Sequence, residues 1–88
     1  MKQTIAMIFD IDVVVDFFLR VDDLIGRQAT GTPAELAQTL DIGERSVYRL
    51  IEKLKRRNLP IAYCRLRRTY YYTTPGKLRI TFEPLDTD

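Results

Sequence analysis

The sequence contains no histidine and only one cysteine, Cys64. A zinc site needs several cysteine or histidine ligands, so this composition cannot supply one. A single cysteine also excludes an internal disulfide, and the lack of histidine removes the side chain most used for acid–base catalysis. No glycine-rich phosphate loop is present. We therefore expect a protein that is not an enzyme and has no metal or cofactor, and we interpret Cys64 as a small buried apolar residue.

Long apolar runs are also missing. No stretch approaches the ~20 residues that a membrane-spanning helix needs. The first nine residues contain one basic residue and are followed by Asp10 and Asp12, a pattern too short and too soon acidic for a secretory signal. We expect a cytoplasmic protein. With 88 residues, 45% of them hydrophobic and 30% charged, the chain has the size and composition of one globular domain.

The net charge of +2 is unevenly distributed along the chain. Residues 1–44 contain three basic and eight acidic side chains, a net charge of −5, whereas residues 45–88 contain eleven basic and four acidic ones, a net charge of +7. Glu52 is the only acid between positions 45 and 79. A basic half of this kind is typical of a surface that binds nucleic acid. A solvated surface with an accidental excess of charge is the alternative.

Hydrophobic periodicity predicts a first helix from about Asp12 to Gln28. Its apolar residues recur at helical spacing and form one stripe: Val14, Phe17, Phe18, Val21, Leu24 and Ile25. Asp10 or Asp12 can cap its N-terminus, where acidic side chains also suit the helix dipole. Residues 1–11 receive no firm assignment, although a short strand over residues 4–9 is possible.

Two shorter helices are predicted next. Thr32-Pro33-Ala34-Glu35 is a capping box with proline at the first helical position, and the helix that it starts ends near Leu40. After the break at Asp41-Ile42-Gly43, a third helix runs from about Glu44 to Arg57. Its inward residues share one face: Val47, Leu50, Ile51 and Leu54. Asn58 and Pro60 end this helix.

The sequence period changes after Pro60. Residues 61–65 and 69–73 are rich in residues that favour strands and flank a short link, which predicts a β-hairpin. Pro75-Gly76 marks a turn. Alternating Leu78, Ile80 and Phe82 suggest a third strand over residues 77–82, and residues 84–88 read as a loose tail. The predicted fold is therefore α+β and mainly α, a three-helix winged helix-turn-helix domain with a C-terminal hairpin as the wing.

The third predicted helix carries the clearest functional pattern. With Val47 facing inward and about 100° per residue, four charged side chains fall on the opposite face. These are Arg45, Arg49, Glu52 and Arg56, with Tyr48 and Lys53 on their flanks. A helix fits the major groove of B-DNA, where arginine can pair with guanine or hold phosphate. We expect Glu52 to pair with Arg49 or Arg56 along the helix.

The segment from Leu36 to Ile51 reads L-A-Q-T-L-D-I-G-E-R-S-V-Y-R-L-I. It resembles the helix-turn-helix of bacterial winged-helix regulators, namely the DeoR-type regulators and the N-terminal domain of the biotin repressor, which typically read L-A-x-x-L-G-V-S-x-R-T-V-Y-R-x-I. The resemblance extends over roughly residues 14–74. Asp41 departs from it where glycine is usual, and Gly43 departs from it where serine or threonine usually caps the helix.

The resemblance implies a DNA-binding transcription regulator and a role for each matching residue. Arg45 and Ser46 would read bases, and Tyr48 and Arg49 would bind phosphates or bases. Lys53, on the flank of this face, is also expected to contact DNA. In the wing, three arginines would reach the DNA backbone or the minor groove: Arg65, Arg67 and Arg68. Duplex DNA is thus the expected partner.

Several alternatives remain open from the sequence. Val15 and Leu19 fall outside the main stripe of the first helix. We therefore predict that they and the N-terminal segment contact a second copy or another protein, or else pack on the domain's own strands. Tyr70 to Tyr72 can pack the wing or stack on RNA bases. A winged domain can also serve as a protein-interaction module, because this fold does not define a function.

Overall fold

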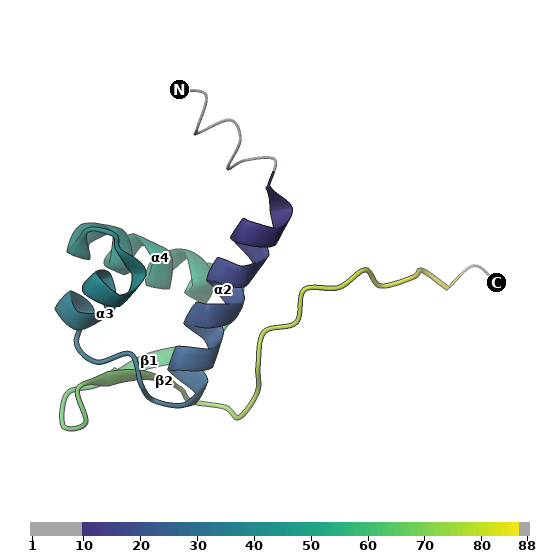
Figure 1. Cartoon of the computed structure of the whole chain (residues 1–88). Helices are drawn as coiled ribbons and strands as arrows, with labels where there is room; N and C mark the ends of the chain where they lie inside the picture. The colour runs from purple at the N-terminus through teal and green to yellow at the C-terminus, as the bar shows by residue number, and fades with distance from the viewer. Residues whose placement is uncertain (1–9, 87–88) are drawn as a thin grey trace.

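The computed structural model describes residues 10–86, which form three helices followed by a two-stranded antiparallel hairpin (Figure 1). The helices are α2 (Ile11–Gly26), α3 (Pro33–Leu40) and α4 (Glu44–Arg56). The strands are β1 (Ile61–Cys64) and β2 (Thr69–Tyr72). This is a winged helix-turn-helix layout of the α+β, mainly α class, as the sequence predicts. No helix in this part of the chain is long and apolar enough to cross a membrane.

Local sequence explains where the helices begin. The Asp10 carboxylate accepts a hydrogen bond from the Val13 N–H and caps α2. At α3 the capping box is complete, since the Thr32 hydroxyl accepts from the Glu35 N–H and the Glu35 carboxylate accepts from the Thr32 N–H. These two reciprocal bonds satisfy backbone donors that the first helical turn leaves without partners.

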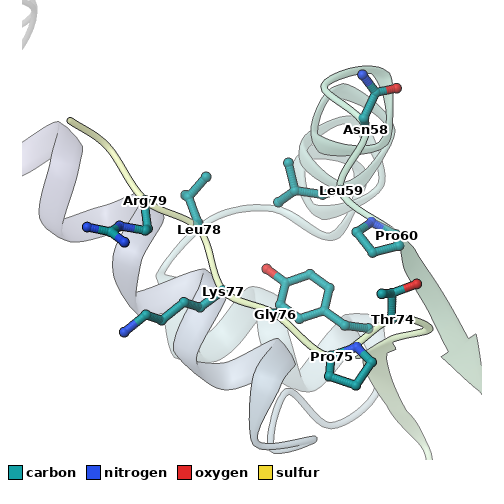
Figure 2. A pocket seen from close by; sticks show the side chains of 10 residues that line it. Asn58, Leu59, Pro60, Thr74, Pro75, Gly76, Lys77, Leu78 and Arg79 are labelled. Carbon is teal, nitrogen blue, oxygen red and sulfur yellow. The ribbon is translucent and has the colours of Figure 1, made fainter. Parts of the chain in front are cut away.

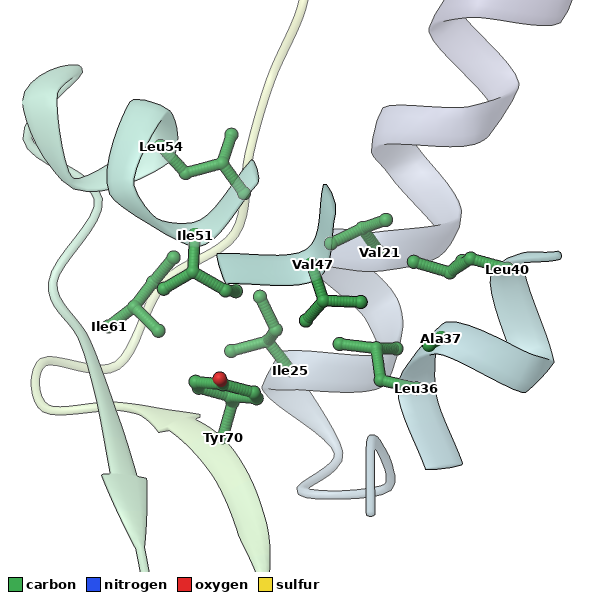
Figure 3. Packing of buried hydrophobic residues seen from close by; sticks show 10 residues of the cluster. All are labelled: Val21, Ile25, Leu36, Ala37, Leu40, Val47, Ile51, Leu54, Ile61 and Tyr70. Atoms are coloured by element: carbon green, nitrogen blue, oxygen red, sulfur yellow. The ribbon is translucent and has the colours of Figure 1, made fainter. Parts of the chain in front are cut away.

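The hydrophobic core lies where the three helices meet the hairpin (Figure 3). Val21 and Ile25 of α2 are fully buried, as are Leu36 of α3 and Val47 of α4. The remaining core residues are Ala37, Leu40, Ile51, Leu54, Ile61 and Tyr70. Burying each large apolar side chain stabilises the fold by about 1.5–3 kcal/mol. The inward face predicted for α4 is therefore correct, with Leu50 half-buried at its edge.

The hairpin pairs Ile61 with Tyr72 and Cys64 with Thr69, so residues 65–68 form its turn. The hairpin prediction is confirmed, with each strand one residue shorter than expected. Cys64 is half-buried rather than buried, because it stands at the end of β1 where the core no longer covers it. Its Sγ accepts a hydrogen bond from the Arg67 N–H at 3.4 Å, which lowers the pKa of the thiol.

The predicted third strand over residues 77–82 is wrong. This segment follows Pro75 and Gly76, crosses from the hairpin to α2 and continues away from the domain without a strand partner among the described residues (Figure 1). Its Leu78 N–H donates to the Asp22 carboxylate instead of to a neighbouring strand. Apolar side chains therefore alternate along this segment although it does not pair with a strand of the described residues. The strand considered for residues 4–9 lies outside the described residues.

Candidate nucleic-acid interface

The turn between α3 and α4 sets the angle at which α4 is presented. Asp41 adopts the left-handed conformation, with φ 55° and ψ 48°, and its N–H donates to the Gln38 carbonyl. The Ile42 N–H then donates to the Ala37 carbonyl at 3.0 Å. Aspartate tolerates this conformation better than most residues, which explains how a residue with a side chain occupies this position. Gly43 precedes α4 and supplies no side-chain cap.

The outward face of α4 is basic and exposed. Arg45, Ser46, Arg49 and Lys53 are all exposed, while Val47 between them is fully buried. The structure therefore brings the residues predicted on α4 to one accessible side of the helix. Glu52 shares this side.

The predicted ion pairs of Glu52 do not form. Within residues 10–86 the one ion pair joins Arg27 to Asp23 at 2.7 Å on α2. An exposed ion pair of this type adds little to the stability of the fold. Glu52 and the arginines are therefore about as stable when water solvates each of them separately. As a result, the arginines of α4 are not neutralised by contacts within the described part of the chain.

Tyr48 of α4 is exposed, in contrast to two tyrosines of the hairpin. Its side chain is 53% exposed, and its hydroxyl donates to the Glu44 carboxylate at 3.3 Å. Tyr63 of β1 and Tyr70 of β2 meet edge to face, with ring centroids 5.0 Å apart. Burial of Tyr70 raises the pKa of its hydroxyl, chiefly through desolvation. Tyr48 is thus an exposed aromatic side chain on the same helix as the cationic residues.

The three wing arginines have different surroundings. Arg67 donates from its guanidinium to the Gln28 side-chain oxygen and lies over the ring of Tyr71, with 5.8 Å between the guanidinium carbon and the ring centroid. Arg65 and Arg68 are exposed, and no side-chain hydrogen bond is formed by either within residues 10–86. Arg67 therefore contacts the domain, whereas the exposed Arg65 and Arg68 form no such contact in residues 10–86.

Two of the three consecutive tyrosines are packing residues. Tyr70 belongs to the core, and Tyr72 donates its hydroxyl proton to the Asp22 carboxylate at 2.6 Å. Tyr71 lies on the opposite face of the hairpin under Arg67. An RNA-stacking surface made of all three rings is thus not available, because the rings of Tyr70 and Tyr72 point into the domain.

A pair of buried threonines attaches the wing to the loop after α2. The hydroxyl oxygens of Thr30 and Thr69 lie 3.0 Å apart, and both residues are 3% exposed. The Thr30 hydroxyl also accepts from the Tyr70 N–H at 2.9 Å, and the Thr69 hydroxyl accepts from the Thr30 N–H at 3.3 Å. Buried polar groups are stable only when such partners are present. This network keeps the wing in place beside the helices.

Asp22 forms a second polar junction that the sequence reading missed. This carboxylate is only 9% exposed, and its Oδ1 accepts both from the Tyr72 hydroxyl and from the Leu78 N–H at 2.8 Å. It therefore ties α2 to β2 and to the segment that follows the hairpin. Its position offered a clue, because an acid three residues before Ile25 and four after Phe18 sits at the edge of the apolar stripe.

A hollow of about 320 Å³ opens beside this junction (Figure 2). It lies between residues 58–60, which follow α4, and residues 74–79, which follow the hairpin. In Figure 2, Lys77 and Arg79 point to the side of α2. Both residues line the hollow, but their charged ends extend toward α2 in this view.

The surface predicted to contact a second copy is partly covered by the same chain. Val15 is half-buried and Leu19 is 39% exposed. Leu19 lines a hollow together with Asp22 and residues 77–81. The alternative that these residues pack on the domain itself therefore holds for part of this surface, with an extended segment in place of a strand.

No group of three or more cysteine, aspartate and glutamate side chains in the described residues is arranged to hold a metal ion. Comparisons of the chain with protein-family models, with curated proteins and with solved structures give no match.

Proposed function

We propose that this chain binds duplex DNA sequence-specifically, with α4 in the major groove and the hairpin of residues 61–74 as a wing. The observation that carries the proposal is the basic outward side of α4, whose cationic side chains are exposed and have no ion-pair partner in residues 10–86. A helix presented in this way has the width and the donors that groove recognition requires. A role as a transcription regulator follows from that activity.

Each side chain has a role in the proposal. Arg45 and Ser46, in the first turn of α4, would contact base edges, and Arg49 would contact phosphate or bases. The N-terminus of α4 adds backbone N–H groups that favour phosphate. Tyr48 and Lys53 would bind the phosphates flanking the contacted bases.

The wing would contribute phosphate contacts through Arg65 and Arg68, which are exposed at the hairpin turn. Arg67 would contribute less, since its guanidinium already contacts Gln28 and Tyr71. Breaking those contacts to reach DNA would require a change of rotamer. The contacts of Arg67 within the domain support a smaller role for it than for Arg65 and Arg68.

Selection from a random duplex library, followed by a salt titration on the selected site, tests the proposal. Arg45→Ala and Arg49→Ala should each weaken specific binding by about 1–3 kcal/mol, as expected for loss of a base or phosphate contact. Arg20→Ala on α2 and Arg79→Ala after the hairpin are matched controls, because each removes one exposed positive charge outside the proposed face. Equal binding by all four variants would contradict the groove assignment.

We also propose that a second copy contributes half-site recognition through residues 1–11 and α2, including Val15 and Leu19. Symmetric dimers of small DNA-binding domains gain affinity by reading two half-sites. A strictly monomeric mass by light scattering at high concentration, together with a selected site lacking symmetry, would count against this arrangement.

A protein-interaction module is the second candidate function. It is favoured by exposed apolar side chains outside the DNA face, since Leu66 is 93% exposed and both Phe82 and Leu85 are 87% exposed. Absence of DNA affinity at low salt would favour this candidate over DNA binding, because phosphate contacts are strongest under that condition.

A further inference from the structure

A shallow groove of about 350 Å³ runs between α2 and α4. Half-buried apolar side chains line it, namely Phe17, Phe18, Ile42 and Leu50. Exposed Ser46, Arg49 and Lys53 of α4 complete its wall. The groove thus combines an apolar floor with a cationic rim, and no segment of residues 10–86 fills it. A ligand that fits must present apolar and acidic groups together.

The segment after the hairpin has that chemistry. Residues 82–86 read Phe-Glu-Pro-Leu-Asp, and Phe82 and Leu85 are each 87% exposed. Pro84 disfavours helix at Glu83 and favours a polyproline II conformation. With three residues per turn, this conformation puts Phe82 and Leu85 on one side and Glu83 and Asp86 on another. The segment is therefore an extended strip with separate apolar and acidic sides.

We propose that this groove binds residues 82–86 of a second copy of the chain. Phe82 and Leu85 would cover the apolar floor, and Glu83 and Asp86 would lie against Arg49 and Lys53. The opposite charges and the two exposed apolar surfaces are complementary, which favours this pairing over one between like surfaces. Pro84 restricts the free segment and so lowers the entropy lost on binding.

The occupant comes from a second copy because the segment leaves its own domain on the far side. Leu78 is held to Asp22 of α2, and residues 77–81 lie beside Leu19. Figure 1 shows the segment continuing on one side of α2 while α3 and α4 lie on the other. Reciprocal exchange of two such segments gives a closed two-fold dimer. Its contacts lie on the Phe17–Phe18 side of α2, unlike the dimer contact through Val15 and Leu19.

Sedimentation velocity on the full chain tests the proposal in the absence of DNA. The parent should form a concentration-dependent dimer, and Phe82→Ser with Leu85→Ser should raise its dissociation constant at least about tenfold. Both side chains are exposed in the described structure, so the folded domain should be retained, as circular dichroism can verify. A fluorescent peptide of residues 78–86 should bind the doubly substituted chain, whose own segment no longer competes.

A charge exchange locates the contact. Lys53→Glu and Glu83→Lys should each weaken the dimer about two- to five-fold, and the two substitutions together should restore it. Lys55→Glu, on α4 outside the groove, is the control and should leave dimerisation unchanged. Three results would each overturn the proposal. The parent could remain a monomer at the highest protein concentration measured, the effects of the two substitutions could simply add, or Lys53→Glu could leave peptide binding unchanged. If the protein is a monomer and Phe82→Ser changes the nuclear magnetic resonance signals of the groove residues, the segment binds the groove of the same chain instead.

One consequence rests on the proposed DNA-binding function. Arg49 and Lys53 belong both to the groove rim and to the proposed DNA face, so a docked segment and DNA would compete for them. The peptide of residues 78–86 should then reduce DNA affinity. Dimerisation measured without DNA and DNA binding measured with the doubly substituted chain can fail separately, which distinguishes the two proposals.

Discussion

The hydroxyl of Tyr72 donates to the carboxylate of Asp22 at 2.6 Å, joining the second strand of the wing to α2 across 50 positions of sequence. The same carboxylate oxygen accepts from the Leu78 N–H, so one buried acid fixes both the wing and the segment that follows it. Desolvation and this hydrogen bond raise the pKa of the Tyr72 hydroxyl above its ordinary value of 10.0. Because of this raised pKa, the stability of the fold should fall as the pH becomes alkaline.

Tyr72→Phe should lower the free energy of unfolding by about 1.5–3 kcal/mol at neutral pH, because the charged Asp22 carboxylate loses the hydrogen bond that it accepts from the Tyr72 hydroxyl. A raised folded-state pKa means that the stabilisation is fully present below pH 10, the unfolded-state value, and is lost as pH rises above it. The parent should therefore lose up to about 1.4 kcal/mol per pH unit more than the variant above pH 10. Urea titrations between pH 7 and 11 measure both effects.

Tyr71→Phe is the matched control for that experiment. Its hydroxyl has no hydrogen-bond partner in residues 10–86, and its ring lies on the outer face of the hairpin. This variant should stay within about 0.5 kcal/mol of the parent at neutral pH. Equal losses in the two variants would show that the bond between Tyr72 and Asp22 adds nothing specific.

The threonine network predicts a second stability effect. Thr69→Val should destabilise the fold by about 1–3 kcal/mol, because it leaves the buried Thr30 N–H without its hydroxyl acceptor. Thr69→Ser keeps the hydroxyl and should cost less than about 1 kcal/mol, the range of strand preferences. Denaturant unfolding of both variants measures the difference. A Val variant as stable as the Ser variant would rule out a stabilising role for the hydroxyl.

Local patterns in the sequence predicted the elements of the fold but not their polar connections. The capping box at Thr32 and the stripe of α4 around Val47 depend on neighbours within four residues, so they could be found without coordinates. The bond between Thr30 and Thr69 joins residues 39 positions apart, and nothing local marks either one. The prediction of a third strand was wrong for a related reason, since alternating apolar side chains at Leu78 and Ile80 do not reveal whether a partner strand exists.

The candidate site was predictable in part. Helical spacing alone placed Arg45 and Arg49 on the outward side of α4, and the structure agrees. The retention of Arg67 by Gln28 could not be foreseen, because it depends on how the hairpin turn packs against the end of α2. Likewise, the groove beside Lys53 depends on how α2 crosses α4, which side-chain periodicity does not specify.

Gly43 offers a way to strengthen the proposed recognition helix. Its φ of −73° and ψ of 154° suit any residue, and a Cβ there would meet no atom within 4 Å. Gly43→Ser should raise the free energy of unfolding by about 0.5–1.5 kcal/mol, through a new cap for α4 and a less flexible unfolded chain. A Cβ at Gly76 would also meet no atom within 4 Å, and this residue lies outside any helix. Gly76→Ser therefore measures the contribution of the less flexible unfolded chain alone. If thermal unfolding shows that Gly76→Ser stabilises the protein as much as Gly43→Ser does, a stabilising cap on α4 is excluded.

Arg68 allows the stability of the wing to be separated from its charge. This residue has φ 53° in the hairpin turn, a conformation that costs side chains with a Cβ about 1–2 kcal/mol. Arg68→Gly should therefore be at least as stable as the parent, whereas Arg68→Ala keeps the strain and should be about 1 kcal/mol less stable than the glycine variant. Both remove one positive charge and should weaken binding to the selected DNA similarly, with a salt slope reduced by about 1. Denaturation and salt titration of the two variants check this, and an affinity that follows stability instead of charge would remove Arg68 from the DNA interface.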